Sequence, residues 1–213
     1  MYYVDAVNSV LKRLRENDVL TVDQDERSKV VGEFVNDALK EVEDAWDWQV
    51  KYTTDNIPVV ADVYNYTILD SNGRITINNV YNLTDSTLMR KSSKRVMRHQ
   101  KINDTGATTS PYTWAQGPMT GGHNTIDIHP TPDKAYTLNI SYYQRSGLLV
   151  ADGDEIEVPA QPVVLLAYAK ALRERGEDPQ STALIYQEAR RSLSDAVAYD
   201  SALDDDDTTW EVV

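Results

Sequence analysis

The chain has 213 residues, of which 41% are hydrophobic and 26% are charged, and this is the composition of a folded soluble protein with a core of its own. The lack of cysteine excludes disulfides, thiolate metal sites and cysteine nucleophiles, and three histidines leave little material for a metal site or a catalytic dyad. The formal net charge of −13 argues against tight, sequence-independent DNA binding by the whole surface.

The first residues contain neither a basic segment nor an apolar one, and no apolar run approaches the roughly 18 residues of a membrane-spanning helix. We therefore expect no secretory signal and no membrane partner.

Two amphipathic helices are predicted at the start of the chain, because apolar side chains recur there every three or four residues. The first covers about residues 2–16. The second should end near Trp46 to Trp48, with Thr21 or Asp23 as its N-cap. Its apolar stripe consists of Val31, Phe34, Val35, Ala38, Val42, Ala45 and Trp46.

Two further helices are predicted near the end of the chain. Pro162 suits a first helical position, and Gly176 suits the stop after the last turn. Residues 163–169 are apolar on all sides, which predicts a central place in the core. Asp178 is the expected cap of the next helix, and an acidic segment follows Tyr199.

Turn residues and alternating segments replace the helical pattern from about residue 49 to residue 145. Residues 63–69 and 74–83 flank an Asn-Gly turn, which predicts a hairpin. Residues 125–129 and 135–144 predict a second strand pair, with a third strand of the same meander around Trp114. A set of alternating residues should share the buried face of the last strand: Tyr136, Leu138, Ile140 and Tyr142. A short surface helix is expected within residues 92–102.

These elements predict an α+β fold, in which a four-helix bundle from the N- and C-terminal helix pairs carries an inserted antiparallel β region. The predicted segments are the N-terminal helices (1–48), the β region (49–158), the C-terminal helices (159–199) and a flexible acidic arm (200–213).

No nucleophile–base pair, phosphate loop or pair of metal-binding carboxylates can be placed, so we expect no enzyme, no cofactor and no metal. We interpret His123 and His129 as ordinary hydrogen-bonding or surface residues, and Gly121-Gly122 as a hairpin turn. The run from Asp204 to Asp207 lacks the interleaved spacing of a calcium loop. Trp46 and Trp48 are expected to form a hydrophobic lock rather than a ligand stack.

Residues 90–101 form a basic patch with no acidic residue. Its six cations are Arg90, Lys91, Lys94, Arg95, Arg98 and Lys101. The rest of the chain has 15 basic and 34 acidic residues, so charge is strongly segregated. Contact with nucleic acid, contact with the acidic surface of a neighbouring identical subunit, and a merely solvated face all remain open.

The acidic arm also has two interpretations. It is either a frayed terminus or an anchor that orders on a partner, with Trp210 as the main contact.

The order of parts resembles that of the head-to-tail adaptors of short-tailed bacteriophages, the tail-tubular-A-like group. The second helix ends in an aromatic pair within Asp44-Ala45-Trp46-Asp47-Trp48, and Tyr64-Asn65-Tyr66-Thr67-Ile68 follows. Ser110-Pro111-Tyr112-Thr113-Trp114 precedes a glycine turn. The most characteristic stretch is residues 130–143, and a proline-led helix completes the pattern.

The resemblance implies a structural protein of the virion neck, assembled in the host cytoplasm. Such adaptors form a ring, usually of twelve copies, between the portal protein and the tail nozzle protein, with a channel that double-stranded DNA traverses without tight binding. The arm would contact the portal, through Ala202, Leu203, Asp204, Asp205, Trp210, Val212 and Val213.

An alternative function is a carbohydrate- or peptide-binding module of a tail or surface protein. It depends on an exposed aromatic strip in the β region, made of Tyr112, Trp114, Tyr136, Tyr142 and Tyr143.

Overall fold

The computed structural model describes residues 1–72, 74–103, 106 and 108–203, apart from the side chains of residues 69–72. The chain divides into two compact units. The helical unit contains Met1–Val50 and the chain from Ser146 onward, and the β unit is Lys51–Arg145.

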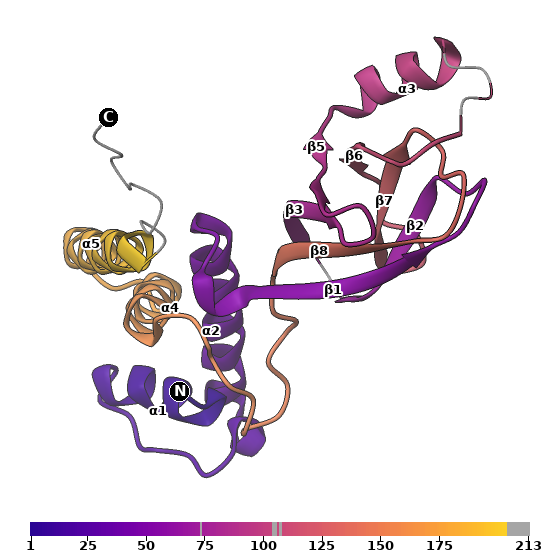
Figure 1. Ribbon diagram of the computed structural model, residues 1–213. Coiled ribbons are helices and arrows are strands. Elements are labelled where there is room, and N and C mark those ends of the chain that lie inside the picture. The colour runs from indigo at the N-terminus through magenta and orange to yellow at the C-terminus, as the bar shows by residue number, and fades with distance from the viewer. Residues whose placement is uncertain (73, 104–105, 107, 204–213) are drawn as a thin grey trace. The chain divides into compact units, whose positions relative to one another are not determined.

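Four α-helices build the helical unit: α1 (Tyr3–Arg13), α2 (Glu26–Ala45), α4 (Ala160–Glu174) and α5 (Pro179–Leu203). The short 3-10 helix η1 (Val22–Gln24) joins α1 to α2, and a second one, η2 (Gln49–Lys51), follows α2. Helix α4 contacts each of the other three α-helices (Figure 1). Of its predicted apolar run, residues 163–169, all are buried except Tyr168, which is half-buried.

Helix α2 begins one 3-10 turn later than the predicted caps require. Asp25 is the N-cap, because its Oδ1 accepts a hydrogen bond from the Ser28 amide at 2.7 Å and the Ser28 Oγ accepts one from the Asp25 amide at 3.2 Å. Thr21 instead precedes η1 and makes no side-chain cap. The predicted cap of α5 is confirmed, since Asp178 accepts a hydrogen bond from the Ser181 amide at 2.9 Å.

The predicted four-helix bundle with an inserted antiparallel β region is wrong as a description of the fold. The described residues contain five α-helices and two four-stranded sheets, an α+β mixture in which the β region is more than a small insertion. The four helices of the helical unit do not share one core equally, because α5 buries only Ala189 completely. Periodicity gives the width of an apolar stripe, but it does not show how completely another helix covers it.

The first sheet of the β unit has the strand order β1 (Tyr52–Val59), β8 (Tyr136–Gln144), β3 (Ile75–Asn82) and β4 (Thr87–Leu88). The second has the order β2 (Asn65–Asn72), β7 (His123–His129), β6 (Thr113–Gln116) and β5 (Arg90–Lys91). All neighbours are antiparallel except β5 and β6. Helix α3 (Lys94–Asn103) follows β5 and confirms the predicted surface helix.

Both predicted strand pairs are wrong, because each places its two strands in different sheets. Strand β2 pairs with β7, whereas β3 pairs with β8 and β4. The third predicted strand does pair with β7, as β6. Alternating side chains reveal which face of a strand is buried, but backbone hydrogen bonds decide its neighbour, and these leave no mark in the sequence.

One core fills the β unit and draws side chains from both sheets. Ile77 and Ile140 come from the first sheet, and Ile68, Trp114 and Ile128 come from the second. The predicted buried face of β8 is confirmed, because Tyr136, Leu138, Ile140 and Tyr142 are all buried. The alternation therefore predicted the inward face of this strand correctly.

Candidate interaction surfaces

The basic patch lies on β5 and α3, at one edge of the second sheet (Figure 1). Met97 is the only fully buried residue of α3, so the rest of that helix projects side chains toward solvent or the surface. Lys94, Arg98 and Lys101 are spaced four and three residues apart, which aligns them on one side of the helix. Five of the six cations are exposed and Lys101 is half-buried.

Two cations of the patch are held by aromatic rings. The Nζ atom of Lys101 lies 3.2 Å from the centre of the Tyr64 ring, and that of Lys91 lies 5.3 Å from the Trp114 ring. Partial burial lowers the pKa of Lys101, and the nearby Asp127 opposes this shift. The other four cations of the patch have no ion-pair partner among the described residues, so they are available to an external anion.

The segregation of charge follows the division into units. The helical unit has 11 basic and 27 acidic residues, whereas the β unit has 10 and 7. Their net charges are therefore −16 and +3. Because the basic patch supplies six of the ten cations in the β unit, one small surface accounts for its positive sign.

Four carboxylates gather beside Tyr3, and we call them the acidic face: Asp23, Glu33, Asp152 and Asp154. Burial raises the pKa of the Tyr3 hydroxyl, and the charges of these four residues raise it further. The Val22 amide donates to Asp152 Oδ1 at 2.8 Å, and the Tyr3 amide donates to the Asp154 carbonyl at 2.8 Å, which holds the loop against α1 and η1. Asp23 and Glu33 are exposed.

The arm begins inside α5 rather than after it. Helix α5 continues to Leu203, so Ala202 and Leu203 are helical, whereas Asp204, Asp205, Trp210, Val212 and Val213 lie outside the described residues. Asp200 Oδ2 accepts hydrogen bonds from the Trp46 indole and the Gln49 amide, both at 3.0 Å. The end of α5 is thereby attached to the end of α2.

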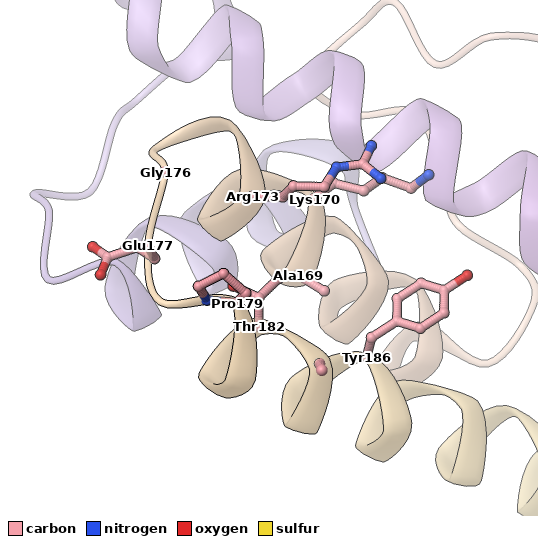
Figure 2. Close-up of a pocket in the computed structure, with 9 residues that line it drawn as sticks. Ala169, Lys170, Arg173, Gly176, Glu177, Pro179, Thr182 and Tyr186 are labelled. Carbon is pink, nitrogen blue, oxygen red and sulfur yellow. The ribbon is translucent and has the colours of Figure 1, made fainter.

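A pocket of about 580 Å³ lies between the end of α4 and the start of α5 (Figure 2). Ala169, Pro179 and the Tyr186 ring line it together with Lys170 and Arg173. Glu41 fixes two of these residues, because Lys170 Nζ lies 3.3 Å from its Oε2 and the Tyr186 hydroxyl donates to its Oε1 at 3.0 Å.

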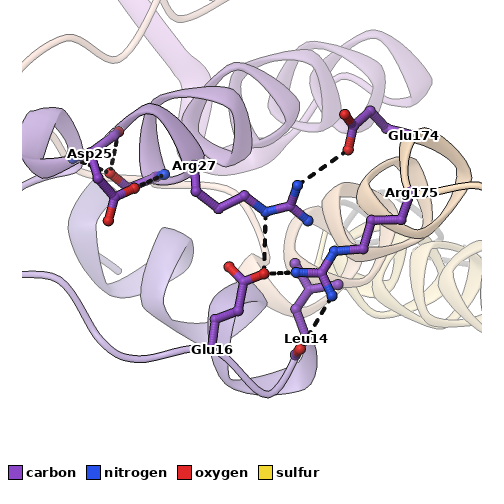
Figure 3. A network of polar contacts seen from close by, with 7 residues as sticks. Leu14, Glu16, Asp25, Arg27, Glu174 and Arg175 are labelled. Atoms are coloured by element: carbon purple, nitrogen blue, oxygen red, sulfur yellow. Dashed lines mark hydrogen bonds and ion pairs between the residues drawn. The ribbon is translucent and has the colours of Figure 1, made fainter.

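A polar network joins the ends of three helices (Figure 3). Glu16, after α1, pairs with Arg27 of α2 at 3.3 Å and with Arg175 after α4. Arg27 also reaches Glu174 at 3.4 Å, and Arg175 donates to the Leu14 carbonyl at 3.3 Å. The polar residues around the turn after α1 therefore have a structural role, because they hold the ends of α1, α2 and α4 together.

The remaining sequence candidates have structural roles. Gly121 and Gly122, with φ of 60° and 86°, form the predicted tight turn between Thr120 and His123, which are bridged by reciprocal backbone hydrogen bonds. His129 is buried at the end of β7. Among the described residues, no group of three or more His, Asp or Glu side chains is arranged to hold a metal ion, and no helix is long and apolar enough to cross a membrane.

The exposed aromatic strip required by the alternative function does not exist. Trp114, Tyr136, Tyr142 and Tyr143 are buried in the β unit, and only Tyr112 is exposed, with 53% of its surface accessible. Trp48 is fully buried in the core of the helical unit, and Trp46 packs against that core half-buried. The two tryptophans are thus packing residues rather than a ligand stack.

A family model described as SU10 adaptor protein matches residues 1–211. The chain belongs to this family. The SU10 adaptor family is a family of phage head-to-tail adaptors, so the predicted resemblance is confirmed and the chain is a structural component of the virion neck. No curated protein matches the adaptor chain.

Asp200 was predicted as the first residue of the arm, but in this adaptor it lies inside α5. A usable signal was present, because Asp200 continues the inward stripe formed by Ala189, Leu193 and Ala196. A polar residue on an apolar stripe is a candidate for a buried hydrogen bond, and Asp200 makes two.

Proposed function

We propose that this adaptor forms a ring, of twelve copies as the resemblance implies, between the portal protein and the tail nozzle protein. The ring surrounds a channel through which double-stranded DNA passes. The observation that carries the proposal is the match of one adaptor family model to residues 1–211, nearly the whole chain.

The negative charge of the helical unit supports the passage of DNA without tight binding. A net charge of −16 repels phosphate, so DNA that passes such a surface is not retained. Tyrosine and tryptophan outnumber phenylalanine by 17 to 1 in the sequence, which suits contacts between subunits because these rings have polar tips.

We further propose that the arm attaches the ring to the portal. The Asp200 hydrogen bonds fix the end of α5. The segment after α5, which contains the remaining acidic residues and Trp210, is therefore connected to a fixed helix end. Attachment through this segment depends on the portal being in place, which gives ordered assembly.

Electron microscopy of the adaptor mixed with its portal tests the function directly. We expect the adaptor to appear as a ring on one end of the portal, and to be present in purified virions. Adaptor that stays unbound at saturating portal concentration, or purified particles without it, would contradict the proposal.

A further inference from the structure

The basic patch and the acidic face are complementary surfaces that one chain carries on different units. The patch offers four cations that form no ion pair with any residue the structure describes, Arg90, Lys94, Arg95 and Arg98. The acidic face offers four carboxylates, and none of these has an ion-pair partner among the described residues either. Asp23 and Glu33 are exposed, whereas Asp152 and Asp154 are half-buried and accept backbone hydrogen bonds.

We infer that the basic patch of one copy contacts the acidic face of the next copy, and this inference rests on the proposed ring. A ring that closes by rotation needs two different surfaces on each subunit, one for each neighbour. A subunit with a β unit of +3 and a helical unit of −16 has such a pair, and electrostatic attraction favours the head-to-tail contact over contacts between like units.

Double-stranded DNA is the competing occupant of the patch. A phosphate backbone would have to approach a protein whose net charge is −13, and it would gain only the few cations of one helix and one edge strand. An identical neighbour has the same net charge of −13, but each copy brings both a patch and a face, so attraction between these two surfaces offsets the repulsion at every contact of the ring.

Two ordered lysines of the basic patch also favour a protein contact. Lys101 and Lys91 are held over aromatic rings, so part of the patch is already ordered before a partner arrives. Tyr64, which contacts Lys101, and Tyr112, whose carbonyl accepts a hydrogen bond from the Arg90 amide, are 47% and 53% exposed and provide apolar area beside the charges.

Charge reversal tests the contact. The patch variant combines Arg95→Glu and Arg98→Glu, and the face variant combines Asp23→Lys and Glu33→Lys; all four residues are exposed, so the fold should be kept. Each variant should reduce adaptor retained on the portal by at least about tenfold, because opposed charges become like charges. The chain with all four substitutions should regain most of the binding. The matched control for the patch variant, Lys40→Glu with Arg191→Glu, makes that variant's charge change at exposed sites outside the patch and should bind normally.

Cross-linking identifies the surfaces in contact. A carbodiimide joins lysine to carboxylate directly, and mixing isotope-labelled with unlabelled adaptor shows which links join different copies. We expect links from Lys94 or Lys101 to Asp23 or Glu33 between copies, both on the portal and in concentrated adaptor alone. Links between copies that join only other surfaces, or none in either sample, would overturn the inference.

Two outcomes separate this inference from its competitors. If the unaltered adaptor does not bind the portal, the proposed function fails, while cross-links in concentrated adaptor still decide the contact. If the patch variant assembles normally but loses binding to a 30-base-pair DNA duplex, measured by fluorescence anisotropy, the patch is a nucleic-acid surface and the inference is wrong.

Discussion

Asp200 joins two parts of the chain that are 154 residues apart in the sequence. Its single Oδ2 accepts hydrogen bonds from an indole and from a backbone amide, so one carboxylate fixes both the Trp46 side chain and the turn after α2. Hydrogen bonds to a charged acceptor are stronger than those to a neutral one, so we expect this carboxylate to contribute to stability.

We predict that Asp200→Ala lowers the free energy of unfolding by about 1–3 kcal/mol, because two donors lose a charged acceptor. Urea unfolding followed by circular dichroism measures the change. Asp195→Ala, an exposed position on the same helix, is the matched control and should stay within about 0.5 kcal/mol of the unaltered chain. Equal stability of the two variants would show that the Asp200 contacts contribute nothing.

The two tryptophans after α2 should differ in their contribution to stability. Trp48 has no exposed surface and donates its indole N–H to the Val42 carbonyl at 2.9 Å, whereas Trp46 is half-buried. Trp48→Ala should cost about 3–5 kcal/mol, the range for buried aromatic truncations. Trp46→Ala should cost less. The reverse order in urea titrations would show that Trp46 is the principal packing residue.

At the scale of the element, the carboxylates of Asp25 and Asp178 stabilise the N-termini of α2 and α5. The amides of Ser28 and Ser181 donate hydrogen bonds that lower the pKa of Asp25 and Asp178, respectively. Since each folded pKa lies below the unfolded value of about 3.9, this stabilisation is present above that pH and is lost as pH falls through the folded pKa.

Asp25→Asn combined with Asp178→Asn should therefore flatten the acid side of the stability curve. Asparagine accepts the same backbone hydrogen bonds but does not titrate, so the melting temperature should fall less steeply between about pH 5 and pH 2. Asp37→Asn with Asp195→Asn removes two exposed carboxylates outside the caps and should leave the slope unchanged. Identical slopes for both double variants would contradict the role of the caps.

The helices of this adaptor were largely predictable, and the sheets were predictable only in part. Stripes such as that of α2 depend on neighbours three and four residues away, so the sequence alone contains the signal. The partners of β8 are β1 and β3, which lie far away in the sequence, so no local pattern specifies them. The acidic face was not predictable either, because η1, α2 and the loop at Asp152 meet only after folding.

At the scale of the whole molecule, the two units divide the charge between them. The basic patch was recognisable from the sequence as a run of cations without acids, but its relation to a β unit of +3 required the division of the chain. Segregated charge of this kind favours self-assembly in one orientation, which is the requirement for a ring.

Removing residues 204–213 should leave the fold intact and prevent attachment to the portal. The cut follows Leu203, so Asp200 and its two hydrogen bonds remain. We expect an unchanged melting temperature and at least about tenfold less adaptor on portal-bearing heads, because the proposed anchor is gone. Normal tail acquisition by heads that receive the shortened adaptor would rule out the arm as the attachment point.

The first and last long strands of the β unit, β1 and β8, are neighbours, with Tyr52 opposite Tyr143. The chain therefore enters the β unit and leaves it, some ninety residues later, on adjacent strands. Because the two ends of the β unit adjoin, this unit can change in length or content without a change in the path of the helices. A change within the β unit can therefore leave the connections of the helical unit as they are.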